Sequence, residues 1–421
     1  MTERPPLNLF SSDTTAAISA SDVALVFDPA RLTQARQLAG LTKAALAAQI
    51  GVSGAAVSQW ESLASPPRPD HLKRAAEVLD VPVEFFAAGR PFAQLDGAGA
   101  HFRSLRSTKA AQRAKAVAFA QQVWELTYAL EKHVQFPAID LPGFLPDDPT
   151  RLGDTPAEAA RALRAHWGLV RGPIPHLVRT METRGIVTIM VAFADKDTPT
   201  INAFSTSRMP RPTIVLTPDR GDDVYWHRFT AAHELGHLVL HRNAAPGDAE
   251  QEREADAFAA EFLTPADQIT DRLPRRFDFK ALQQLSYEWG VSIKSLVYRS
   301  RETGAISDAV ARRAFQRLNH LYDIGMLGAD PVTQYPGETP TLLAKAFELA
   351  ETHGTLTLTS LAAELRWRPK RLRQLLDRSD QRPILRLVTD TEAAPGTGAP
   401  ERQAQSTSSA SLEGIAGPRR A

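Results

Sequence analysis

The stretch that most constrains the fold is the apolar segment 228–241, which reads Arg-Phe-Thr-Ala-Ala-His-Glu-Leu-Gly-His-Leu-Val-Leu-His. Its small and apolar residues predict a buried helix. Residues four apart lie on one face of a helix, so His233 and His237 present both imidazoles on the same side. Imidazole nitrogen is a common ligand of Zn²⁺, which takes about four ligands in a tetrahedron. The pair is therefore a predicted metal site, and the adjacent Glu234 is the predicted base that takes a proton from water there.

The stretch 251–265 is predicted to form a second helix that Pro265 stops, because apolar residues recur there at helical spacing. Glu252 and Asp256 are four apart on it. The pair can supply one metal ligand and one carboxylate that holds the outer nitrogen of a histidine. Glu254 is the competing ligand, since it adjoins the apolar face. The alternative for these acids is a solvated helix face.

The histidines on either side of the motif are not predicted ligands. His227 lies six residues before His233, which is the wrong helical face. His241 continues the four-residue spacing, but a third imidazole from one straight helix would lie about a turn too far away. His241 is therefore interpreted as a helix-end residue near the negative end of the helix dipole.

Together these residues resemble the ImmA/IrrE metallopeptidases. The resemblance rests on His233 to His237, on Glu252-x-Glu254-Ala255-Asp256-x-Phe258-Ala259, on Leu263-x-Pro265, and on the preceding Ile201 to Phe204 and Arg228 to Thr230. It implies a Zn²⁺-dependent endopeptidase with His233 and His237 as ligands, Glu234 as the base and a downstream glutamate as the third ligand. Thr264 stands where the family often has methionine.

Residues 29–90 are predicted to form a group of short helices, two of which flank Gly51-Val52-Ser53. Thr42 and Ser53 are the predicted N-caps of these two helices. The stretch resembles the Cro/repressor-type (XRE-like) DNA-binding domain. The matching residues are Leu41-Thr42, Leu46-Ala47, Ile50 to Ser53, Val57 to Glu61, Leu72, Ala76 and Leu79. The resemblance implies that the helix from Ser53 to Trp60 enters the major groove with its N-terminal turn.

The residues expected at the DNA are Thr42, Lys43, Ser53, Ala55, Ala56, Ser58 and Gln59. Gln59 can read an adenine edge. The reading helix has no Arg or Lys, so phosphate contacts would come from basic residues of its neighbours. The family often has glycine near position 63, where this chain has Leu63. The alternative interpretation is a domain used for docking or for homodimer formation.

Composition sets outer limits on the chain. Its 421 residues suffice for two or three domains. A formal charge of +1 argues neither for nor against nucleic acid, so any basic footprint must be local. The absence of cysteine excludes disulfides and thiolate zinc sites and fits a reducing compartment. We find no signal peptide and no membrane-length apolar run, and the simplest predicted location is the cytoplasm.

The predicted fold class is α+β, mostly α. It combines a five-helix helix-turn-helix domain, a zincin-like peptidase domain with a small sheet, and a helical C-terminal region. The predicted boundaries are a disordered arm over 1–28, the DNA-binding domain over 29–90, a helical connector and linker over 91–150, the peptidase domain over 151–306, a helical region over 307–390, and a disordered tail over 391–421.

Strands are predicted over 185–191, 203–205 and 213–216, before the metal helix. One edge of this sheet could align an extended peptide by strand addition, and the sequence does not choose the edge. Residues 278–306 contain a second helix-turn-helix-like pattern around Gly290-Val291-Ser292. We interpret it as structural, with holding a substrate or nucleic acid as the alternative. The region 340–378 is predicted to form two further helices.

The predicted function is that of a zinc-dependent endopeptidase fused to a DNA-binding domain. Zn²⁺ on His233, His237 and Glu252 is expected to activate water, while Glu234 takes a proton and passes it to the leaving nitrogen. Arg228 is one candidate for stabilising the oxyanion. The resemblance suggests a regulator of transcription that cleaves a repressor. Two alternatives remain: a transcription regulator with a sensing or structural metal site, and a toxin–antitoxin or phage-defence component that acts through protein contacts.

Overall fold

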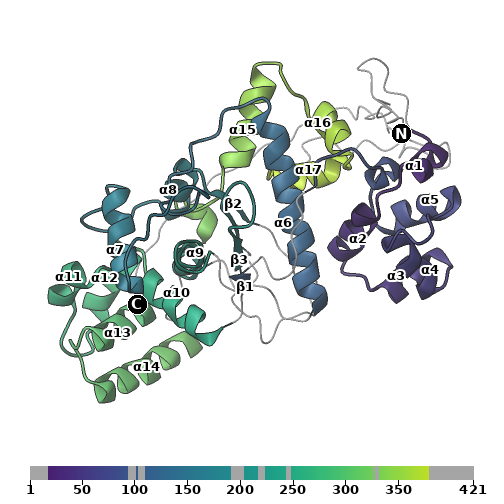
Figure 1. Ribbon diagram of the computed structural model, residues 1–421. Helices are drawn as coiled ribbons and strands as arrows, with labels where there is room; N and C mark the ends of the chain where they lie inside the picture. Colours follow the sequence, from purple (N-terminus) through teal and green to yellow (C-terminus); the bar gives the residue numbers. More distant parts are fainter. Residues whose placement is uncertain are drawn as a thin grey trace, which may run out of the picture. The chain divides into compact units, whose positions relative to one another are not determined.

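The computed structural model describes residues 18–92, 110–190, 203–216, 223–242, 248–325, 327 and 331–378, together with the backbone of 101–102 (Figure 1). The predictions for 1–17, for most of the Phe102-Arg103-Ser104 connector and for the tail from 391 therefore lie outside the described residues. No helix within the described residues is long and apolar enough to cross a membrane.

The N-terminal region is a bundle of short helices, and the predicted caps form. Its elements are α1 (Ala20–Leu25), α2 (Pro29–Leu38), α3 (Lys43–Ile50), α4 (Gly54–Glu61), α5 (Pro69–Val78) and the 3₁₀ turn η1 (Val83–Phe86). Thr42 caps α3 through the amide of Ala45, and Ser53 caps α4 through the amide of Ala56. Gly51 joins the two helices with φ of +76°, a conformation that favours glycine.

Helix α1 corrects the predicted disordered arm, because residues 20–25 are ordered. Ser19 and Asp22 cap this helix reciprocally. Val23 is completely buried and Phe27 nearly so, and both belong to the hydrophobic core of the N-terminal bundle. Burial of these two side chains offsets the entropy cost of ordering the segment. The prediction missed this contribution because the residues around them are mostly polar.

A long helix, α6 (Ala110–Glu131), packs against α2 of this bundle and against the C-terminal helices. The C-terminal helices are α15 (Leu342–Thr352), α16 (Leu358–Leu365) and α17 (Pro369–Leu375), so 340–378 forms three helices where two were predicted. The buried carboxylate of Glu125 on α6 accepts from Arg31 at 2.5 Å, Gln34 at 2.8 Å and Arg90 at 3.1 Å. These charge-assisted bonds tie α6 to the bundle.

The sheet has four strands in the order β1-β3-β4-β2 within the described residues. They are β1 (His101–Phe102), β2 (Val187–Met190), β3 (Ala203–Thr206) and β4 (Thr213–Leu216). The three predicted strands are confirmed, and β1 was not predicted. Strand β1 pairs antiparallel with β3, whereas β2 runs parallel to β4.

The two sheet faces contribute to different hydrophobic cores, as the two-residue period of a strand requires. Phe204 and Val215 join the core of α6 and α15, while Ala203 and Ile214 join the core of the metal helix. The second core also includes α7 (Pro156–His166), α8 (Leu177–Thr183), α12 (Phe279–Trp289), α13 (Ile293–Glu302) and α14 (Asp308–Asp323). The predicted α+β, mostly α class is confirmed.

The metal helix α9 (Val224–Leu240), seen end-on in Figure 1, lies beside β3 and packs most extensively on α10 (Ala249–Leu263). Gly236 permits this approach. A Cβ atom there would lie 3.1 Å from Cδ1 of Phe258 and 3.3 Å from Cα of Ala255. The glycine inside the motif therefore sets the spacing that lets side chains of both helices meet.

Candidate metal centre

Helix α9 begins at a strong cap and is buried along most of its length. The Asp223 carboxylate accepts from the amides of Tyr225 at 2.8 Å and Trp226 at 3.1 Å. His233 and His237 lie in the buried part of the helix, with about 1 % of each side chain exposed. Their rings are held in a T-shaped arrangement with centroids 4.8 Å apart. The helix thus delivers two fixed imidazoles to one point.

The donor atoms converge as a metal site requires. Nε2 of His233 and Nε2 of His237 are 3.1 Å apart. The Glu252 carboxylate reaches both of them, with Oε2 3.5 Å from His233 and Oε1 3.5 Å from His237. Two ligands that are each about 2.0–2.1 Å from a tetrahedral zinc lie about 3.3 Å from one another. The two imidazoles and the carboxylate therefore fit a divalent ion without rearrangement.

The outer nitrogen of each imidazole has its own partner. Nδ1 of His233 lies 2.7 Å from Oδ1 of Asp256. Nδ1 of His237 lies 3.0 Å from Nδ1 of His241, and Nε2 of His241 lies 2.8 Å from Oε2 of Glu254. Partners of this kind fix the orientation of metal-binding histidines. Sequence reasoning anticipated this role for Asp256 and missed it for His241, although the four-residue spacing was visible.

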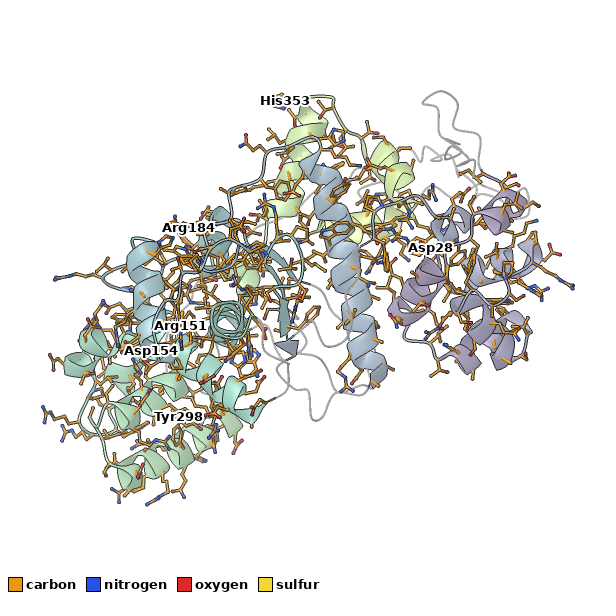
Figure 2. The ribbon with its side chains drawn as sticks, viewed as in Figure 1. Asp28, Arg151, Asp154, Arg184, Tyr298 and His353 are labelled. Atoms are coloured by element: carbon orange, nitrogen blue, oxygen red, sulfur yellow. The ribbon has the colours of Figure 1, made fainter. Side chains whose placement is uncertain are left out.

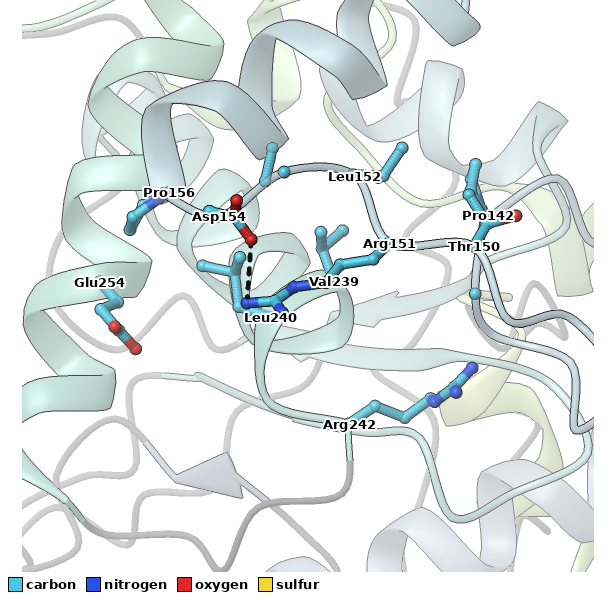
Figure 3. Close-up of a pocket in the computed structure, with 13 residues that line it drawn as sticks. Pro142, Thr150, Arg151, Leu152, Asp154, Pro156, Val239, Leu240, Arg242 and Glu254 are labelled. Carbon is cyan, nitrogen blue, oxygen red and sulfur yellow. Dashed lines mark ion pairs between the residues drawn. The ribbon is translucent and has the colours of Figure 1, made fainter.

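Glu254, the alternative ligand, lies away from the convergence point. It pairs with His241 and lines a pocket of about 360 Å³ beyond the end of α9. Figure 3 shows Glu254 among the lining residues of that pocket, with Arg242 and the Arg151–Asp154 ion pair of 3.5 Å. Of these two acids, Glu252 is the one whose carboxylate reaches both imidazoles, because α10 presents the two side chains in different directions.

Burial and pairing leave the site in the charge state that a metal needs. Burial lowers the pKa of His237 and so favours the neutral imidazole, although a hydrogen bond that the Glu252 carboxylate accepts acts in the opposite direction. Burial raises the pKa of Glu252, but hydrogen bonds to His233 and His237 outweigh it and lower the pKa to about 2. A neutral imidazole and an ionised carboxylate are the forms that coordinate metals.

Glu234 is fully buried on the same turn of α9 and faces β3. The Ser205 hydroxyl of β3 donates to its Oε2 at 2.8 Å. Residue 205 is paired with His101 of β1 on one side of β3 and with Ile214 of β4 on the other, so Glu234 contacts an inner strand of the sheet. The sequence could not supply this contact, because nothing local links residue 205 to the motif.

Arg228 does not face the place where the donor atoms of His233, His237 and Glu252 converge, so it is no longer a candidate for stabilising the oxyanion. Its guanidinium is buried and donates to the carbonyl oxygens of Gly290 at 2.8 Å and Ile174 at 2.6 Å, and to the Glu338 carboxylate. These bonds join three segments that are far apart in the sequence. Arg228 is thus a structural residue of the domain.

The residues expected at DNA lie on the open side of the N-terminal bundle. Thr42, Lys43, Ser53, Ala55 and Gln59 are exposed, and Ala56 and Ser58 are half-buried. The Lys43 ammonium lies 3.4 Å from Glu61. Leu63, where the resemblance led us to expect glycine, adopts φ of +57° and is 58 % exposed. The turn after α4 therefore has the left-handed conformation that explains a preference for glycine.

Comparison with known families agrees with both halves of this description. A model described as the IrrE N-terminal-like domain, a metallopeptidase family, matches residues 182–301. A helix-turn-helix model matches residues 32–86. No curated protein matches the chain. The chain therefore carries an XRE-type helix-turn-helix domain, which supports DNA binding, followed by a domain of the IrrE-like metallopeptidase type.

Proposed function

We propose that this chain is a cytoplasmic zinc-dependent endopeptidase that regulates transcription by cleaving a repressor. The observation that carries the proposal is the convergence of two buried imidazoles and Glu252 beside the buried carboxylate of Glu234. A structural metal site has no use for an additional buried acid at this place. An endopeptidase needs one, because water must lose a proton and the leaving amine must gain one.

The chain's own residues account for the proton transfers. Zn²⁺ held by His233, His237 and Glu252 would supply Lewis acidity towards water and the scissile carbonyl. Glu234 accepts the proton of the attacking water and returns it to the leaving nitrogen. The Ser205 hydroxyl, 2.8 Å from Glu234, holds that carboxylate in one orientation during both transfers. Asp256 and the His241–Glu254 pair keep the imidazole rings aimed at the metal.

The N-terminal domain supports the regulatory part of the proposal. A protease fused to a DNA-binding domain meets a DNA-bound repressor at high local concentration, so a weak protease–repressor contact suffices. The exposed residues of α3 and α4, with Gln59 at the base edges and Lys43 at a phosphate, are the proposed DNA contacts. The same domain could instead let the chain regulate its own promoter.

Metal content tests the ligand set directly. Wild type dialysed against excess Zn²⁺ and then against buffer should retain about one zinc per chain by mass spectrometry of the metal. His237→Ala and Glu252→Ala should lose it. Glu254→Ala, the matched control from the same helix, should retain zinc with affinity lowered about 10-fold to 100-fold, because its effect passes through His241. Loss of zinc in Glu254→Ala with retention in Glu252→Ala would contradict the proposed set.

Cleavage tests the enzymatic part. Purified chain with Zn²⁺ is incubated with a panel of repressor proteins, beside Glu234→Gln, which keeps the metal ligands and removes the base. Cleavage by wild type that Glu234→Gln lacks supports the proposal. Equal products from both chains, or no cleavage of any repressor, removes it. DNA binding that survives Glu234→Gln but changes on chelation would then favour the regulator with a sensing metal.

A further inference from the structure

A second hollow of about 750 Å³ lies between α9, α10, α13 and α14. Its position follows from how α9 and α10 run. Glu252 meets His237 and Asp256 meets His233, so the two helices are antiparallel along their shared groove. The next positions along the same faces are Phe229 on α9 and Ala260 on α10, four residues from His233 and Asp256 respectively. Both line the hollow, which therefore continues the groove that holds the metal ligands.

One residue belongs to both the metal site and the hollow. The Asp256 carboxylate bonds Nδ1 of His233 at 2.7 Å and also lines the hollow, with 52 % of its side chain exposed. The hollow therefore begins one side chain away from a metal ligand. A peptide whose scissile bond lies at the metal would place a neighbouring side chain at its mouth.

The walls of the hollow are rich in aromatic rings. Trp226 and Phe229 come from α9, Tyr298 from α13 and Tyr322 from α14. Tyr298, labelled in Figure 2, is 46 % exposed and Tyr322 is 49 % exposed, although large aromatic side chains usually bury most of their surface. The Tyr298 ring already has the Phe315 ring at 4.5 Å and the Arg301 guanidinium at 5.5 Å from its centroid. The surface that the four rings leave open offers apolar faces to the stem of a long side chain and π faces to a cation.

Charge makes the hollow selective. Four carboxylates line it, from Asp223, Asp256, Glu302 and Asp323, against two cations, from Lys294 and Arg299. Arg299 and Glu302 pair with one another at 2.9 Å, and Arg299 also bonds Glu261 and the carbonyl of Thr264. This leaves the carboxylates of Asp223, Asp256 and Asp323 against the ammonium of Lys294. The excess of negative charge raises the cost of an acidic guest and lowers that of a basic one. Burial and then Asp223 raise the pKa of Tyr322, which agrees with a negative potential in the hollow.

We infer that this hollow binds an arginine or lysine side chain of the peptide substrate, close to the scissile bond. The inference rests on the proposed endopeptidase function and adds a substrate class to it. The aliphatic stem lies against Phe229 and Trp226, and the cationic head lies among the tyrosine rings and the carboxylates of Asp323 and Asp223. A docked repressor would therefore be cut beside a basic residue.

The test is a binding measurement on full-length Glu234→Gln without added metal, so that cleavage plays no part. The probes are acetyl-Ala-Ala-Arg-Ala-Ala-amide and the same peptide with lysine, citrulline or glutamate in the central position. The affinity of each peptide is measured by ligand-observed NMR. Citrulline keeps the shape of arginine and removes its charge. The arginine and lysine peptides should bind about tenfold more tightly than citrulline, and glutamate should be weakest, since tenfold corresponds to about 1.4 kcal/mol. A citrulline peptide that binds as well as arginine overturns the inference.

Two variants of α14 localise the effect. Asp323→Asn removes one charge of the hollow and should reduce the arginine-over-citrulline ratio about threefold or more. Asp308 lies at the other end of the same helix, outside the hollow, and its side chain is 78 % exposed. Asp308→Asn should therefore leave the arginine-over-citrulline ratio unchanged. Equal ratios in the two variants contradict the assignment. Melting temperatures of both should match that of Glu234→Gln, which excludes unfolding as the cause.

The two proposals fail separately. Preferential binding of basic peptides with no cleavage of any substrate by wild type would keep the binding site and remove the endopeptidase. Cleavage by wild type at sites with no basic residue on either side of the cut would keep the endopeptidase and overturn the inference.

Discussion

The same three residues make a turn at two places in this chain, and the two turns have different environments. Gly51-Val52-Ser53 joins α3 to α4, and Gly290-Val291-Ser292 joins α12 to α13. The glycines adopt φ of +76° and +62°. Each serine caps the following helix, with Ser53 accepting from Ala56 at 3.2 Å and Ser292 from Ser295 at 3.0 Å. Local sequence therefore produces the same local geometry in both domains.

An arginine donates a hydrogen bond to a carbonyl at each turn, but one arginine is exposed and the other is buried. Arg74, which is exposed, donates to the carbonyl of Ile50 at 3.0 Å. Arg228, which is buried, donates to Gly290 at 2.8 Å and continues to Glu338. Helix α4 leaves its outer face to solvent, whereas α13 buries Ile293, Leu296, Val297, Arg299 and Ser300. The turn sequence therefore specifies a conformation, and packing decides which face of the following helix stays open to a ligand.

The largest expected difference between the two turns comes from their arginines. Arg228→Met leaves the Glu338 carboxylate, which is fully buried, without its counter-charge, and should lower the free energy of unfolding by about 3–5 kcal/mol. Arg74→Met removes one bond from an exposed side chain and should cost about 0.5–1.5 kcal/mol. Denaturant unfolding followed by circular dichroism measures both. Equal losses would contradict the contrast between a buried and a solvated turn.

The pH dependence of Arg228→Met supplies an internal control. Burial already raises the pKa of Glu338 in the wild type, with Arg228 acting against it. Without Arg228 the folded-state pKa rises further above the unfolded value, so the folded state binds a proton that the unfolded state lacks. Stability of the variant should therefore increase relative to wild type as pH falls from 7 towards 5. Arg74→Met should show no such recovery.

The glycines give the second contrast. Gly51→Ala should lower the free energy of unfolding by about 1–2 kcal/mol, the cost of a left-handed backbone at a residue with a Cβ atom. No steric clash adds to this cost, because the nearest atom to the new Cβ is Nη1 of Arg74 at 3.6 Å. At position 290 the same Cβ would lie 2.8 Å from Nε of Arg228 and 3.0 Å from its Cζ. Gly290→Ala should therefore lose at least about 1 kcal/mol more than Gly51→Ala. Melting curves of the two variants decide this, and a larger loss at position 51 would refute it.

The sequence predicted what depends on neighbours along the chain. The strands, the caps of α3 and α4 and the imidazole pair all follow from periodicity or spacing. It left the choice between Glu252 and Glu254 open, because two positions on a helix differ by about 200° in direction and only the packing of α10 on α9 selects one. Contacts such as Ser205 with Glu234 and Arg228 with Glu338 join distant segments, so no local pattern contains them. His241 lies at the end of α9, as predicted, but its contact with Glu254 was missed for a related reason, since Glu254 comes from the next helix.

The smallest expected effects are losses of binding affinity, and they distinguish α4, which is proposed to contact DNA, from α13, which is proposed to contact the peptide. Gln59 and Tyr298 each lie eight residues after their turn glycine and are both exposed, so they occupy equivalent positions. Gln59→Ala should weaken binding to duplexes selected by wild type from a random pool by about fivefold to tenfold, since one base contact contributes about 1 kcal/mol. Binding is compared at one fixed salt concentration, because the free energy of phosphate contacts changes steeply with salt.

Tyr298→Ala should leave DNA affinity unchanged and weaken binding of the arginine peptide, while Gln59→Ala should leave peptide binding unchanged. Loss of DNA affinity in Tyr298→Ala, or none in Gln59→Ala, would break the division of roles between the two turns.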